Sequence, residues 1–263
     1  MFSLFKKQPL LEEAVVVWLF DAFGWSLRNF GSHHFYGDTE LVTPSNRHFP
    51  GREESVEGMA ALILDRVKAY AGVSHWPTRL LNHHDYEGDP MAEPSSRQVL
   101  ANSAELKLTL FYEPQQVANP QAMIANYAHA LAHHLGGMAN ESPPCEQEHW
   151  PHLTEVLSVY LGFGVIMANS AHPFRGGGCG SCRSAAMDRS GFLAENEITY
   201  ALAIFCVLKA LPAAEVSGLL KSSLRSFFKK AVKEVSERQE ALAVLRAIDC
   251  SAPQYGATAI LSR

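Results

Sequence analysis

Two histidines four residues apart constrain this chain more than any other feature. His129 and His133 lie in the segment 126–137, which reads NYAHALAHHLGG. On an α-helix, side chains four residues apart project from one face, so both imidazoles can reach the same ion. Imidazole nitrogen is a common ligand of Zn²⁺ in proteins. The spacing therefore predicts a zinc-binding helix.

The flanking residues predict that this helix covers about 120–136. Asn119 and Pro120 supply an N-cap and a proline at the first helical position. A buried stripe recurs with helical spacing at Ile124, Ala128, Leu131 and Leu135. Gly136–Gly137 predicts a helix end at a left-handed residue. The preceding run 105–112 alternates polar and apolar residues like a half-buried strand, and a strand followed by a two-histidine helix is the order of the zincin fold.

Ala130 occupies the place where the zinc peptidase motif H-E-x-x-H has its glutamate, the base that activates zinc-bound water. Three explanations stay open. The chain is a pseudoenzyme that keeps a zinc, or the glutamate was exchanged on purpose to inactivate it, or another base serves, with Glu195, His134 and His152 as candidates. Loss of a positioned base costs about 10²–10⁴ in rate. We expect zinc binding with very slow hydrolysis or none.

A catalytic zinc site needs a third protein ligand. Glu155 is the best candidate, since it lies at the edge of the apolar stripe of a helix predicted from residue 151 to 162. His149 and His152 are rival ligands, because they are nearby and one helical turn apart.

Three stretches of the chain resemble a bacterial family of zincin-like proteins. They are YAHALAHHL at 127–135, LTEVLSVYLGFGVIMAN at 153–169 and GFLAENEITYALA at 191–203. Relatives typically read H-E-L-x-H, then L-T-D-L with G-x-G and A-N, then G-Y-L-S-E. The resemblance covers roughly residues 10–210 and implies a gluzincin-like site, with His129 and His133 as ligands and Glu155 where relatives carry Asp.

Further candidate residues lie outside this motif. Glu195 and Tyr200 share a predicted helix, and Tyr200 is a possible donor to a developing oxyanion. Cys179 and Cys182 form a C-x-x-C inside a glycine-rich loop. A zinc ribbon needs a second such pair, so a plain loop, a second metal site and a reversible disulfide all stay open.

Composition limits the class of protein. The 263 residues are 47% hydrophobic and 19% charged, as in soluble globular proteins, and the five cysteines do not form a secreted disulfide framework. A net charge of −5 argues against nucleic acid as the main partner. The apolar run 14–20 is bounded by acidic residues, so we expect no signal peptide, no membrane span and a cytoplasmic bacterial protein.

The predicted fold is α+β and mostly helical. A zincin-like domain would cover residues 1–212, with a small sheet against the metal helix, and residues 213–263 would form a C-terminal helical extension with one basic face. The sequence predicts a zinc metallopeptidase-like protein that acts on a peptide or protein. The alternative is a non-catalytic pseudopeptidase that serves as a metal-stabilised protein-binding module.

Overall fold

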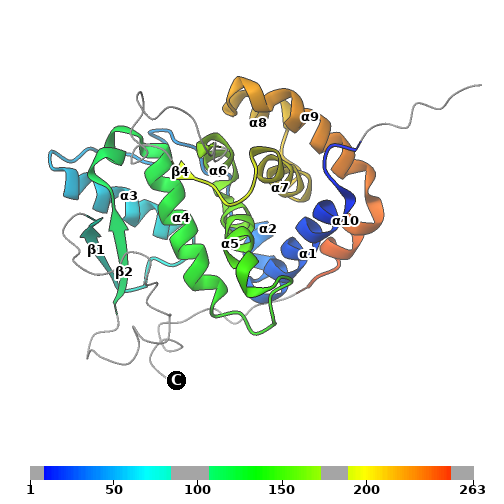
Figure 1. Cartoon of the computed structure of the whole chain (residues 1–263), viewed down its shortest axis with the longest axis horizontal. Helices are drawn as coiled ribbons and strands as arrows, with labels where there is room; N and C mark the ends of the chain where they lie inside the picture. The colour runs from blue at the N-terminus through cyan, green and yellow to red at the C-terminus, as the bar shows by residue number, and fades with distance from the viewer. Residues whose placement is uncertain (1–8, 84–106, 173–188, 250–263) are drawn as a thin grey trace, which may run out of the picture.

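The computed structural model describes residues 9–83, 107–172 and 189–249, and helices make up most of this described part of the chain (Figure 1). The N-terminal part holds α1 (Glu13–Phe30), α2 (Ser32–Gly37) and α3 (Val56–Tyr70). The central part holds α4 (Pro120–Gly136), α5 (Trp150–Ser158) and α6 (Gly164–Ser170). The C-terminal part holds α7 (Glu195–Leu208), α8 (Ala213–Leu219), α9 (Ser222–Glu237) and α10 (Gln239–Arg246).

A small parallel sheet contacts the two-histidine helix. Strands β1 (Thr78–Asn82) and β2 (Leu108–Tyr112) pair in parallel, with Thr78 opposite Leu108, and β2 contacts α4. A second parallel pair joins β3 (Ala171–His172) to β4 (Arg189–Ser190). The predicted mostly helical α+β class is confirmed at this level, whereas the zincin fold stays a prediction.

Helix α4 covers the predicted residues, and its first turn is capped as expected. Asn119 accepts a hydrogen bond from the backbone N–H of Ala122 at 3.4 Å. The predicted left-handed end is wrong, because Gly137 has a right-handed helical φ of −63°. Gly136 instead makes room for a ring: a Cβ there would lie 2.7 Å from the indole of Trp150.

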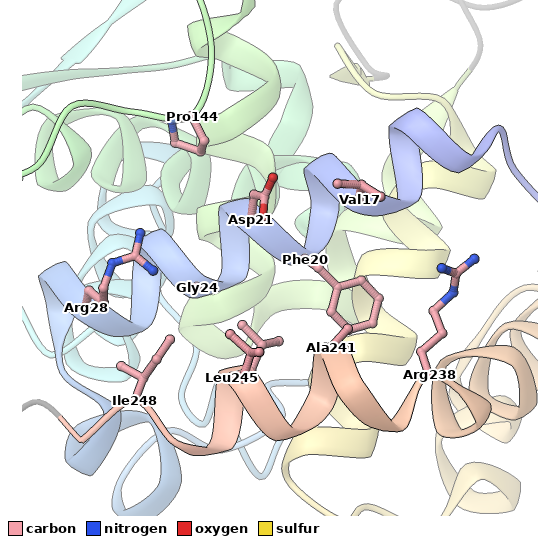
Figure 2. A pocket seen from close by; sticks show the side chains of 11 residues that line it. Val17, Phe20, Asp21, Gly24, Arg28, Pro144, Arg238, Ala241, Leu245 and Ile248 are labelled. Atoms are coloured by element: carbon pink, nitrogen blue, oxygen red, sulfur yellow. The ribbon is translucent and has the colours of Figure 1, made fainter.

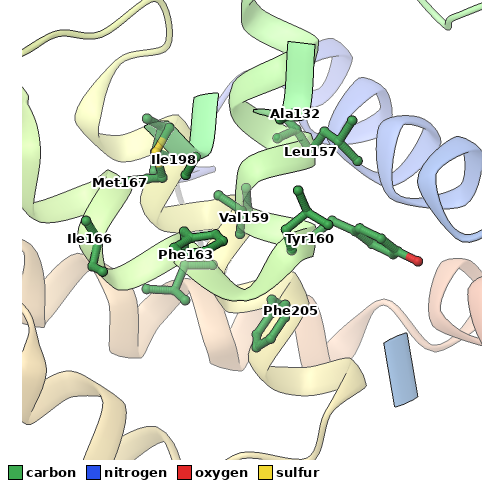
Figure 3. Close-up of a cluster of buried hydrophobic side chains, with 14 of the residues drawn as sticks. Ala132, Leu157, Val159, Tyr160, Phe163, Ile166, Met167, Ile198 and Phe205 are labelled. Atoms are coloured by element: carbon green, nitrogen blue, oxygen red, sulfur yellow. The ribbon is translucent and has the colours of Figure 1, made fainter. Parts of the chain in front are cut away.

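The central core surrounds a kink between α5 and α6. Gly162 has a φ of +99°, and its carbonyl accepts a hydrogen bond from the N–H of Val42 at 2.9 Å. The aromatic rings of Phe35 and Tyr160 stack beside it, with centroids 4.9 Å apart. Figure 3 shows Tyr160, Phe163 and Phe205 in this buried cluster.

The stretch Gln147–Ser170, which includes this kink, is long and apolar enough to cross a membrane. Within the most apolar 18-residue window, however, 94% of the residues are buried inside the protein. That degree of burial is typical of a core helix.

The C-terminal helices share the main core. Helix α9 packs on α7, and α10 packs on α1. Buried side chains from these helices belong to the same apolar cluster as the N-terminal ones, among them Leu224, Phe228, Leu242 and Leu245. Arg238 donates two hydrogen bonds to Glu13, at 2.6 and 2.7 Å, and so links the two ends of the described chain. The domain boundary at residue 212 stays a prediction.

Candidate functional site

The two histidines of α4 lie half-buried at the contact between α4 and α5. His129 Nε2 is 2.7 Å from Thr154 Oγ1 and 3.4 Å from the carbonyl oxygen of Pro151. Thr154 Oγ1 also lies 2.9 Å from the carbonyl oxygen of Pro151, and the tautomer of His129 sets which of the two acceptors receives the single hydroxyl proton. The contact with Thr154 therefore holds Nε2 of His129 and leaves its second ring nitrogen, Nδ1, outside this pair.

His133 has a different partner, Trp150, which lies on α5. The indole N–H of Trp150 donates to His133 Nδ1 at 3.0 Å. An imidazole that accepts at Nδ1 is neutral and carries its proton at Nε2. Gly136 lies one turn further along α4 and leaves room for this indole. The glycine in the helix sequence therefore allows Trp150 to reach His133.

Glu155 is fully buried and holds the start of α7. Its two carboxylate oxygens accept from the backbone N–H groups of Phe192 and Leu193, at 3.1 and 2.8 Å. The Phe192 ring stacks on His129, with a centroid distance of 5.4 Å, and meets His152 edge-on at 6.1 Å. Glu155 and Phe192 therefore connect α5, α7 and the His129 face of α4.

The hydrogen bonds of these side chains bear on whether they suit a zinc ion. A zinc-bound histidine normally uses one nitrogen for the metal and donates the other N–H to an acceptor. His133 instead receives a donor at Nδ1 and carries its proton at Nε2, so no lone pair faces a metal. His129 does not decide the fit, because its Nδ1 could take a metal while Nε2 contacts Thr154. The predicted set of His129, His133 and Glu155 does not fit zinc in this arrangement.

Another group comes closer to a ligand set. Among the residues that the structure describes, Glu146, Glu148 and His149 place one ligand atom each within 4.8 Å of one another. All three are exposed, and such acidic groups are common without an ion. The rival ligand His152 faces His149 with ring centroids 5.5 Å apart, and its Nδ1 is buried with no hydrogen-bond partner in the described chain.

The other predicted residues point toward the C-terminal helices. The Tyr200 hydroxyl donates to Glu234 at 2.9 Å, and burial raises the pKa of this phenol above its usual range. Glu195 forms an ion pair with Lys221. Both residues thus serve contacts between α7 and the segment that holds α9. Cys179 and Cys182 lie outside the described residues.

Sequence reasoning missed Trp150, Thr154 and Phe192. Gly136 was a usable signal for Trp150, because a glycine one turn after a functional residue leaves space for a large ring. Thr154 and Phe192 carry no such signal, since their partners are distant in sequence.

His134 gives a testable pH dependence. Burial, and to a smaller extent the neighbouring His133, lower the pKa of His134 from 6.5 to about 4. Between these values the unfolded chain binds a proton that the folded chain does not. The contribution to stability is therefore complete above pH 6.5 and is lost as the pH falls toward 4. We expect a loss of about 1–3 kcal/mol from this group.

Urea unfolding at a series of pH values measures this loss. His134→Gln should flatten the step between pH 6.5 and 4, whereas His75→Gln, at an exposed histidine, should retain it. An unchanged pH profile in His134→Gln would contradict the assignment.

Comparisons with known proteins add no family. No protein-family model matches this chain, and neither the curated proteins nor the solved structures gave a similar protein. The resemblance to zincin-like proteins therefore stays a prediction drawn from the quoted motifs.

Proposed function

We propose that this chain is a non-catalytic binding protein, in which the two-histidine helix has a structural role. The hydrogen bond from Trp150 to His133 carries the proposal. It uses the lone pair of His133 Nδ1 and leaves the ring proton on Nε2, so neither nitrogen of this ring is available to zinc. Glu155 supports the proposal, since both of its carboxylate oxygens accept from backbone N–H groups. The partner is a protein or peptide, and the net charge of −5 disfavours nucleic acid.

The place of the missing base supports the same proposal. The methyl group of Ala130 cannot accept a proton, and a general base must lie within hydrogen-bond reach of the water that it activates. Of the candidate bases, Glu195 is paired with Lys221, and the possible oxyanion donor Tyr200 instead donates to Glu234. His152 has an unpartnered Nδ1, but that atom is buried.

The second candidate is a zinc metallopeptidase-like protein that hydrolyses peptide bonds once its base is restored. One observation favours it: His129 and His133 share a face of α4, and Glu155 lies on the neighbouring helix α5. Zinc binding would require Trp150 to release Nδ1 of His133. A cytoplasmic location stays a prediction under either function.

Elemental analysis separates the two functions. We expect the purified protein, dialysed against excess Zn²⁺ and then buffer, to retain no more zinc than the His129→Ala/His133→Ala variant. Trp150→Phe keeps an aromatic ring but removes the N–H donor, and we expect this variant to gain zinc affinity. Ala130→Glu should hydrolyse no peptide in a broad peptide library.

Two outcomes would overturn the proposal. One zinc per chain that disappears in the double histidine variant would establish the metal site. Zinc-dependent hydrolysis by Ala130→Glu would establish a peptidase.

A further inference from the structure

A groove between the first and last helices has the features of a docking surface. It has a volume of about 400 Å³ and lies between α1 and α10, with Pro144 at one wall (Figure 2). Its floor is apolar and buried, formed by Phe20 and Leu245. Two large apolar side chains on its edges are exposed to solvent, Val17 at 49% and Val244 at 66%. Exposed apolar side chains that gather on one surface mark interaction sites more often than isolated ones.

The walls of the groove are fixed by hydrogen bonds. The indole N–H of Trp18, on α1, donates to the carbonyl oxygen of Pro144 at 2.9 Å. The Asn29 side chain accepts from the backbone N–H groups of Asn140 and Glu141, at 2.9 and 3.0 Å. The loop that forms one wall is thus held against α1. A preformed surface binds a partner without a large cost for ordering its own side chains.

The charges on the groove favour a cationic partner. Arg28 and Arg238 lie at opposite ends (Figure 2), and each is already paired, Arg28 with Glu141 at 2.8 Å and Arg238 with Glu13. Asp21 lines the groove on α1, is exposed, and has no hydrogen bond or ion pair within the described residues. The charge left for a partner is therefore one carboxylate beside an apolar floor.

We propose that this groove binds an amphipathic helix of a partner protein, with an apolar stripe that contacts Val17, Phe20 and Val244 and a lysine or arginine that pairs with Asp21. From Val17 to Arg28 the groove follows α1 for roughly 16 Å, the length of about three helical turns. Apolar residues at i, i+3, i+4 and i+7 of such a helix fill a groove between two helices. This inference rests on the proposed function as a binding protein and names its surface and partner chemistry.

The probe is a fluorescein-labelled 14-residue peptide of leucine and lysine, with leucines at helical spacing, and binding is measured by anisotropy at 150 mM salt. We expect saturable binding by this peptide and none by a matched leucine–glutamate peptide. Val244→Lys should weaken the affinity at least tenfold. Val56→Lys is the matched control, because Val56 is an exposed valine (45%) outside the groove and the change in net charge is identical.

Asp21→Asn should also weaken binding, whereas Asp65→Asn, at an exposed aspartate on α3, should not. Equal affinity of Val244→Lys and Val56→Lys would overturn the proposal. So would sedimentation that shows a dimer of this chain which Val244→Lys dissociates, because a second copy would then occupy the groove. Zinc content and hydrolysis, measured on the same samples, report on the proposed function separately, since neither depends on Val244 or Asp21.

Discussion

Replacing Gly162 with alanine is expected to lower the free energy of unfolding by at least about 3 kcal/mol. Two costs combine. The residue has a φ of +99°, a conformation that L-residues with a Cβ rarely adopt. In addition, an added Cβ would come far inside 3.0 Å of the carbonyl oxygen of Glu40, which is backbone and cannot swing away. Val42 donates to the Gly162 carbonyl, so the segment that would have to move is anchored at this point.

Urea unfolding of the variant and of Gly218→Ala measures this effect. Gly218 lies in α8 with no heavy atom within 4 Å of an added Cβ, so alanine there should leave stability unchanged or raise it by up to about 1 kcal/mol. If Gly162→Ala unfolded at the same urea concentration as the native protein, the tight contact between the kink and the segment at Glu40 would be disproved.

Glu155→Ala is expected to destabilise the metal-free protein by about 3 kcal/mol or more, because two backbone N–H groups lose their acceptor at a buried site. The affected donors belong to Phe192 and Leu193, which directly precede α7. Glu155→Gln should cost less, about 1–3 kcal/mol, since an amide offers one oxygen where the carboxylate offers two.

Thermal unfolding in the presence of a chelator tests this anchoring role apart from any metal. Glu148→Ala, whose side chain is 73% exposed, serves as the control and should stay within about 0.5 kcal/mol of the native protein. If Glu155→Ala were harmless with chelator but harmful with Zn²⁺, Glu155 would be a metal ligand and the anchoring role would be wrong.

Much of the fold follows from local sequence patterns. The two-histidine helix and the strand that precedes it were expected within a few residues of α4 and β2. Periodicity and the Asn119–Pro120 cap suffice for these elements, because their signals lie within the element itself. The sequence predicted one helix from residue 151 to 162 and no kink at Gly162. Glycine predicts close approach, but the positive φ depends on the distant segment at Glu40.

The candidate site was harder to predict for the same reason. The spacing of His129 and His133 places both on one face of α4, but it does not determine which partner meets each ring. Trp150 and Thr154 lie 17 and 25 residues from the histidines they contact. Which ring nitrogen accepts and which donates in these hydrogen bonds decides whether a metal suits the site. Glu155 was predicted as a ligand from its place at the edge of a stripe. Its two backbone partners come from a segment 37 and 38 residues later.

The pairing of Glu13 with Arg238 has a consequence for synthesis on the ribosome. These residues are 225 positions apart, and α1 packs against α10 beside them. Helix α1 therefore completes its contacts only after α10, more than 200 positions further along the chain, has also been translated. Contacts with such large sequence separation slow folding, because a long loop must close before they form. During that interval Phe20 and its neighbours on α1 remain without α10, so this apolar face of the nascent chain stays uncovered.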